Sequence, residues 1–206
     1  MASEDSAEGA RTPTADDLVR ERRFAEAAAV YEQQAGFHDE AGLLDQAGLA
    51  WLEAARCWQQ DGRRDTAHAA YARGTALLVA GGAEALLVAS VLTAWAPVAF
   101  ASGASDTLLS RLDGLLSRVA DGDAATKAEL LDTRARVLAS FPAADRAPGR
   151  DLVSVGDCGI QAAEAYASVG RTADAAESFW LAGRALRDAG ETGRAVQAIE
   201  SASARW

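Results

Sequence analysis

The sequence predicts an all-α protein, an antiparallel helical-hairpin solenoid of about eight to ten helices. Three observations support this fold class. Alanine dominates the chain, valine and isoleucine are sparse and only 4 of 206 residues are proline, so helix is favoured almost everywhere. Glycines recur at intervals of helical length, as turns between helices require. Two blocks of the chain also repeat one spacing of large and small side chains.

Composition restricts the partners that this chain can bind. The formal net charge is -10 and the pI is near 4.7, whereas nucleic acids and anionic lipids attract clustered basic residues. Lys127 is the only lysine, and the arginines are scattered among acidic residues, as on a solvated helix face. We therefore expect no nucleic-acid partner. Half of the residues are apolar, which is enough for a packed core.

Turn signals divide the chain into segments. Residues 1–13 are predicted to be a flexible acidic tail without a secretory signal, and Thr14 is predicted to cap the first helix. Residues 14–140 are predicted to form the main solenoid, 141–150 a linker or hinge rich in proline, and 151–206 further repeat helices. The glycines expected to bound helices are Gly36, Gly62, Gly81, Gly82, Gly103, Gly122, Gly170 and Gly190.

One stretch has the length of a membrane span. Residues 85–105, "ALLVASVLTAWAPVAFASGAS", carry no charge. Small residues fill much of this stretch, Pro97 interrupts it and no cluster of basic residues flanks it, so a membrane span is not expected. Two alternatives stay open: a helix buried between its neighbours, or an apolar helix at 86–100 that a second copy of the chain covers in a homo-oligomer.

The repeated spacing is clearest around two turn glycines. Trp51, Ala54, Ala55 and Trp58 precede Gly62, and Gly159, Ala162, Ala163 and Tyr166 precede Gly170 at the same offsets. Antiparallel helices need small residues where they approach closely and bulky residues one or two turns away. The two tryptophans are therefore predicted to fill the core rather than to stack on a ligand.

These residues resemble the tetratricopeptide repeat (TPR) family. The resemblance rests on Trp51-x2-Ala54-Ala55-x2-Trp58-x3-Gly62, continued at Ala67, Tyr71 and Gly74, and on the later block from Ala162 to Ala182. It covers about half of the chain, and residues 82–140 match poorly, so the solenoid is predicted to be partly degenerate. No proline ends the units, and the interval from Gly170 to Gly190 is shorter than a full repeat.

The resemblance implies a module that binds a segment of another protein in a concave groove lined by the first helix of each unit. Its residue types suit an extended segment or a helix of the partner. Since asparagine is absent and Lys127 is the only lysine, a carboxylate clamp built from these two residue types is not expected. The candidate groove residues are Leu49, Leu52, Glu53, Arg56, Gln59, Gln60, Asp157, Ile160, Gln161 and Glu164.

Catalytic and metal-binding motifs are not found. The sequence has no nucleophile elbow, phosphate loop or zinc-type His/Cys spacing, so we expect no enzyme, cofactor or metal. His38 and His68 are expected to be partly exposed helix residues, and Cys57 and Cys158 to be buried thiols. The stretch "GDCGIQ" around Cys158 is the only one suggestive of a nucleophile, but it has no identifiable base.

Three functions remain open. The first is a cytoplasmic adaptor or scaffold that binds a protein or peptide in its groove. The second is a chaperone for a secreted or insoluble partner, suggested by the acidic charge and the apolar helix. The third is a regulatory subunit that senses a peptide or small ligand. An amino-acid composition rich in alanine, arginine and glycine is typical of proteins from a bacterium with GC-rich DNA.

Overall fold

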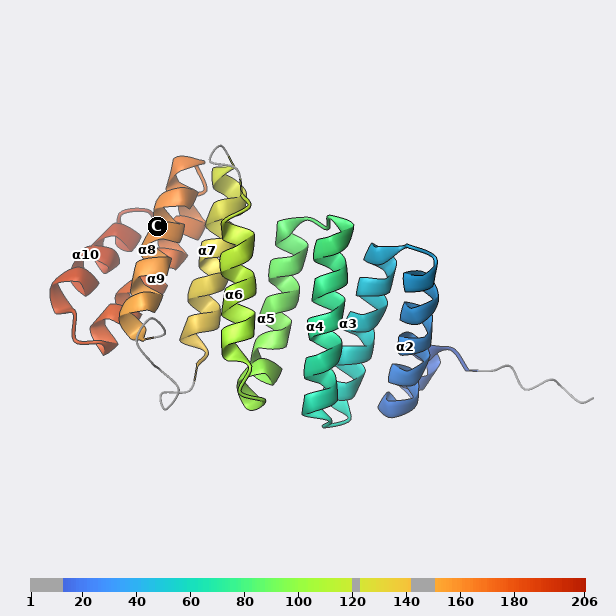
Figure 1. Cartoon of the computed structure of the whole chain (residues 1–206). Helices are drawn as coiled ribbons and strands as arrows, with labels where there is room; N and C mark the ends of the chain where they lie inside the picture. The colour runs from blue at the N-terminus through green and yellow to red at the C-terminus, as the bar shows by residue number, and fades with distance from the viewer. Residues whose placement is uncertain (1–12, 120–122, 142–150) are drawn as a thin grey trace, which may run out of the picture. The chain divides into compact units, whose positions relative to one another are not determined.

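The computed structural model describes residues 13–119, 123–141 and 151–206, and within these ranges it contains ten helices and no strand (Figure 1). The all-α prediction is confirmed, and the helix number lies within the predicted range. The helices are α1 (Ala15–Arg20), α2 (Phe24–Glu40), α3 (Leu44–Gln60), α4 (Arg64–Gly81), α5 (Ala85–Ala101), α6 (Ser105–Leu116), α7 (Ala124–Ala139), α8 (Leu152–Ser168), α9 (Thr172–Asp188) and α10 (Thr192–Ser203).

Three-residue turns built on one motif join most of these helices. After α3, the backbone N–H of Gly62 donates to the carbonyl of Gln59 and that of Arg63 to the carbonyl of Trp58, which is a Schellman closure. The turn requires a positive φ at its centre, which glycine adopts without steric cost. Arg22 takes this conformation at φ 60. The glycines with positive φ are Gly42, Gly62, Gly82, Gly103, Gly170 and Gly190.

Gly36 was predicted to bound a helix, and this prediction is wrong. Gly36 lies inside α2, which continues to Glu40, and the turn glycine is Gly42. Spacing distinguishes the two, because the turn glycines recur every 20 or 21 residues from 42 to 103. Gly122 lies outside the described residues.

The first helix begins as predicted. The Thr14 hydroxyl accepts a hydrogen bond from the Asp17 N–H at 3.2 Å, and the Asp17 carboxylate accepts from the Thr14 N–H at 3.1 Å. This capping box satisfies two N–H groups of the helix start. Most of the predicted tail, residues 1–12, and most of the predicted linker, residues 142–150, lie outside the described part of the chain.

The chain divides into two compact units, residues 1–77 and 78–206. In unit 1, successive helices pack on one another, and contacts also join helices two apart. The Tyr31 hydroxyl in α2 donates to Asp16 in α1 at 2.6 Å. Arg73 in α4 pairs with Asp39 in α2 at 3.4 Å.

The two tryptophans of α3 pack on different neighbours, and only Trp58 is fully within the core as predicted, because Trp51 is partly buried. Trp58 is buried, and its indole N–H donates to Glu32 in α2 at 2.7 Å. Trp51 packs beside Gly74 of α4, where a Cβ added to the glycine would lie 3.1 Å from the Trp51 Cβ and 2.9 Å from the Gly48 carbonyl oxygen. Hence α3 and α4 approach closely at Gly74.

Unit 2 is arranged in two layers of helices. Ser178 of α9 donates to Asp132 of α7 at 2.9 Å, and α5 also packs against α7. Arg194 of α10 pairs with Asp157 of α8. Since consecutive helices also pack together, α5, α7 and α9 form one layer and α6, α8 and α10 the other.

Helix α5, the apolar segment of the sequence, is mostly buried within unit 2. Its central Trp95 has no exposed surface, and Phe100 packs against Phe141 with ring centroids 4.2 Å apart and ring planes tilted by 40°. Leu86 and Leu87 are its exposed large apolar residues. Neighbouring helices thus cover most of α5. In the described residues, no helix combines the length and hydropathy that a bilayer crossing requires.

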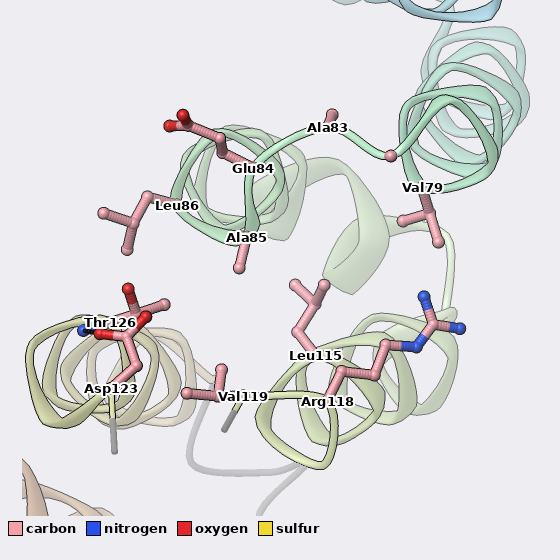
Figure 2. Close-up of a pocket in the computed structure, with 11 residues that line it drawn as sticks. Val79, Ala83, Glu84, Ala85, Leu86, Leu115, Arg118, Val119, Asp123 and Thr126 are labelled. Carbon is pink, nitrogen blue, oxygen red and sulfur yellow. Dashed lines mark hydrogen bonds between the residues drawn. The ribbon is translucent and has the colours of Figure 1, made fainter. Parts of the chain in front are cut away.

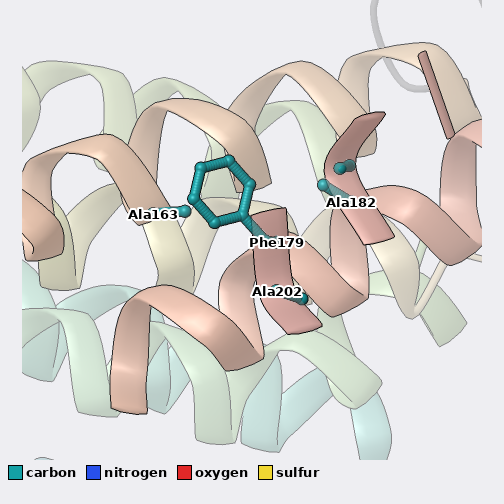
Figure 3. Close-up of a cluster of buried hydrophobic side chains, with 5 residues drawn as sticks. Ala163, Phe179, Ala182 and Ala202 are labelled. Carbon is teal, nitrogen blue, oxygen red and sulfur yellow. The ribbon is translucent and has the colours of Figure 1, made fainter. Parts of the chain in front are cut away.

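The C-terminal core packs one ring among alanines (Figure 3). Phe179 of α9 lies between Ala163 of α8 and Ala202 of α10, together with Ala182 and Ala198. The small residues let the three helices approach closely around a single large side chain. This is the arrangement of large and small residues that the repeated spacing predicts.

Candidate functional site

The candidate groove residues of α3 differ widely in exposure. Leu49 is 46% exposed, whereas Leu52 is only 3% exposed and packs towards Gly74. Leu52 therefore contributes to the core rather than to accessible surface. Glu53 and Arg56 form an ion pair on the surface, and Gln59 accepts a hydrogen bond from the Tyr71 hydroxyl at 3.1 Å. Gln60 is exposed.

The candidate residues of α8 lie beside a cavity. Asp157 and Gln161 line a space of about 350 Å³ bounded by α6, α7 and α8, which we call the α8 cavity. Glu164 is exposed one turn further along α8, and Ile160 packs against the Phe179 core. The full lining consists of Asp113, Leu116, Leu131, Arg134, Ser154, Asp157, Cys158 and Gln161.

An arginine connects the three helices of the α8 cavity. Arg134 of α7 donates through Nε to Asp113 of α6 at 2.8 Å and through Nη1 to the Cys158 Sγ of α8 at 2.7 Å. Its side chain is only 23% exposed. Ser154, near the start of α8, is held by Asp151, whose carboxylate accepts from both the Ser154 N–H and hydroxyl at 2.8 Å. These contacts fix the cavity walls.

Cys158 is packed in the wall of the cavity. It is 5% exposed, and burial raises the pKa of its thiol, although the guanidinium of Arg134 acts in the opposite direction. Cys57 in unit 1 is likewise buried, and burial raises its thiol pKa. The prediction of two buried thiols is confirmed.

We expect both thiols to react slowly with a disulfide reagent such as dithionitrobenzoate in the native protein. A raised pKa leaves less thiolate at neutral pH, and burial also blocks the reagent. Unfolding in denaturant should make both react rapidly. The absorbance of the released thiolate measures each rate, and rapid labelling of Cys158 in the folded protein would restore it as a candidate nucleophile.

The opposite layer holds a cluster of ion pairs between α7 and α9. Asp132 is buried, accepts from Ser178 and pairs with Arg136 at 2.6 Å. Arg171, at the start of α9, pairs with Glu129 and with Asp174. Because the Arg171–Glu129 pair and the hydrogen bond from Ser178 to Asp132 cross from one helix to the other, the cluster joins α7 to α9.

A larger cavity, of about 570 Å³, lies where α4, α5, α6 and α7 begin or end (Figure 2). Val79, Ala85 and Leu115 point towards the same space. Arg118 and Asp123 lie at its edge. Its lining includes Val119 and Asp123, between which residues 120–122 lie outside the described part of the chain.

Sequence reasoning missed the residues that come from α6 and α7. Arg134 contacts Asp113, 21 residues before it, and Cys158, 24 residues after it, and no local sequence motif relates the three residues. The partly exposed positions of His38 and His68 are as predicted. Among the described residues, no group of three or more His, Cys, Asp and Glu side chains has the geometry of a metal site.

Similar structures agree with the architecture. A putative kinesin light chain of Podosopora anserina with nearly identical TPR-like repeats has a TM-score of 0.60 and 16% identity, over 93% of this chain and 90% of that chain. A single-residue variant of that protein gives a TM-score of 0.59 at 15% identity with the same coverage. BtubC (BKLC) from P. vanneervenii gives a TM-score of 0.61 at 18% identity, over 93% and 76% of the two chains.

The chain therefore has an all-α, TPR-like repeat fold, and the resemblance predicted from the sequence is confirmed at the level of the fold. No protein-family model matches the sequence, and no curated protein matches it.

Proposed function

We propose that this protein is a non-catalytic interaction module, an adaptor or scaffold that binds a segment of a partner protein along α8. The observation that carries the proposal is the α8 cavity. Asp157 and Gln161, which the repeat pattern selects as partner-facing, border a cavity of about 350 Å³ instead of a flat helix surface. A TPR-like fold supports this function, because such folds generally serve to bind proteins.

The exposed surface of α8 is suited to a partner segment. Gln161 and Glu164 lie one turn apart on the same face and are both exposed, and Asp157 precedes them by one turn. Mixed polar side chains beside the partly apolar cavity provide hydrogen bonds and packing together. On α3, Leu49, Arg56 and Gln60 form a second exposed candidate surface in unit 1. The proposal places the protein in the cytoplasm, consistent with its two free thiols.

The test is an affinity capture from lysate of the source cell, with bound proteins identified by mass spectrometry. The variant Gln161→Lys/Glu164→Lys changes the partner-facing surface of α8. The chain offers a matched control, Gln197→Lys/Glu200→Lys, because these exposed residues of α10 have the same identities and the same spacing. Both double variants change the net charge equally.

A partner that the α8 variant loses and the α10 variant retains would support the proposal. Far-ultraviolet circular dichroism of both variants checks that the helices remain formed. If wild type enriches no protein, or the α8 variant retains every partner, binding through α8 is refuted. Neither substituted residue of α8 is buried, so the fold should tolerate the change.

A further inference from the structure

The lining of the α8 cavity has a specific chemical character. Its outer part carries two carboxylates, Asp113 and Asp157, whose side chains are 54% and 46% exposed. The lining also includes the aliphatic side chains of Leu116, which is partly buried, and Leu131, which is buried. A lining that combines exposed carboxylates with aliphatic side chains matches a long side chain that ends in a positive charge.

Both carboxylates keep free hydrogen-bonding capacity. The Oδ1 atom of Asp113 accepts from Arg134, and the Oδ1 atom of Asp157 accepts from Arg194. In the part of the chain that the structure describes, the second oxygen of each carboxylate accepts no further hydrogen bond. A carboxylate can accept from two donors at once. The exposed amide of Gln161 adds another acceptor.

Charge favours a cationic occupant over an anionic one. An anion at the mouth would meet two carboxylates, while the guanidinium of Arg134 is already engaged by Asp113 and Cys158. Arg194 neutralises part of the charge of Asp157 and would share that carboxylate with the ligand. The whole chain carries a net charge of -10, which attracts a basic partner over longer range.

We propose that the α8 cavity takes the side chain of an arginine or lysine from a partner segment lying along α8. This inference rests on the proposed function, for which it names the chemistry of the partner. The cationic end pairs with Asp113 and Asp157, and the aliphatic stem packs on Leu116 and Leu131. Because the pairs are partly exposed, added salt weakens the binding.

The test uses immobilised protein and a positional library of short capped peptides, sequenced after elution. Wild type should enrich arginine or lysine at one position. Asp157→Asn and Asp113→Asn should each lower the affinity of the enriched peptide about three- to tenfold. Glu200→Gln, an equal change of charge outside the cavity, should leave the affinity unchanged.

If the enriched peptides show no preference for arginine or lysine, the cavity does not bind a basic side chain, and this inference is refuted. The proposed function as an interaction module would not be affected by that result. A basic preference that survives both aspartate substitutions would also refute the inference. If the library yields no binder, the pocket is again refuted, whereas the capture experiment with the α8 double variant decides the proposed function separately. Circular dichroism confirms that each variant remains folded.

Discussion

Trp95→Ala should destabilise unit 2 by about 3–5 kcal/mol, the largest effect expected for a single substitution in this chain. The ring has no exposed surface and lies in the middle of α5 among other fully buried side chains, Leu92 and Val88 among them. Removing it loses the transfer free energy of the ring and leaves a cavity that rigid neighbouring helices fill only in part. Urea unfolding followed by circular dichroism measures the loss.

Trp180→Ala provides the control for the Trp95 experiment. Trp180 also lies in unit 2, in α9, but it is 49% exposed. Its truncation removes much less contact and should cost clearly less stability. Equal losses for the two variants would contradict the full burial of Trp95 in the core of unit 2.

Gly74→Ala should destabilise unit 1 by about 1–3 kcal/mol, although alanine is the better helix former. The added Cβ would lie 2.9 Å from the Gly48 carbonyl oxygen and 3.0 Å from the Leu52 Cδ2. The backbone atom cannot move aside as the end of a side chain could, so α3 and α4 must separate. Thermal unfolding of the variant measures the shift.

Gly36→Ala is the matched control for Gly74→Ala. Gly36 also lies within a helix of unit 1, but an added Cβ would have no heavy atom within 4 Å. The remaining effect is the higher helix propensity of alanine than of glycine, so the substitution should stabilise the protein by up to about 1 kcal/mol. A destabilised Gly36→Ala, or an unaffected Gly74→Ala, would contradict the helix packing described for unit 1.

The sequence was sufficient to predict the helical class, the first helix cap and most turns, because these depend on local chemistry. Thr14 followed by Asp17 defines a capping box within four residues. A glycine alone is ambiguous, as Gly36 shows, since a turn and a helix interior both accept it. The regular interval between turn glycines resolves the ambiguity only after several turns are compared.

The candidate site could be predicted only in part, because it is assembled from separate helices. The TPR resemblance selected Asp157 and Gln161, which border the α8 cavity. It could not show that Arg134 bridges Asp113 and Cys158, because those contacts depend on how α6, α7 and α8 pack. The resemblance also selected Leu52, which is buried where Gly74 lies close to α3.

The alternation of helices between two layers in unit 2 restricts how its length can change. One helix with its turn spans 20 residues from Gly170 to Gly190, and each such module moves the next helix to the opposite layer. Inserting a single module between α6 and α8 would carry Asp157 and Gln161 to the other layer, away from Asp113. Versions of this protein that keep the α8 cavity should therefore gain or lose such modules only before α6 or after α8.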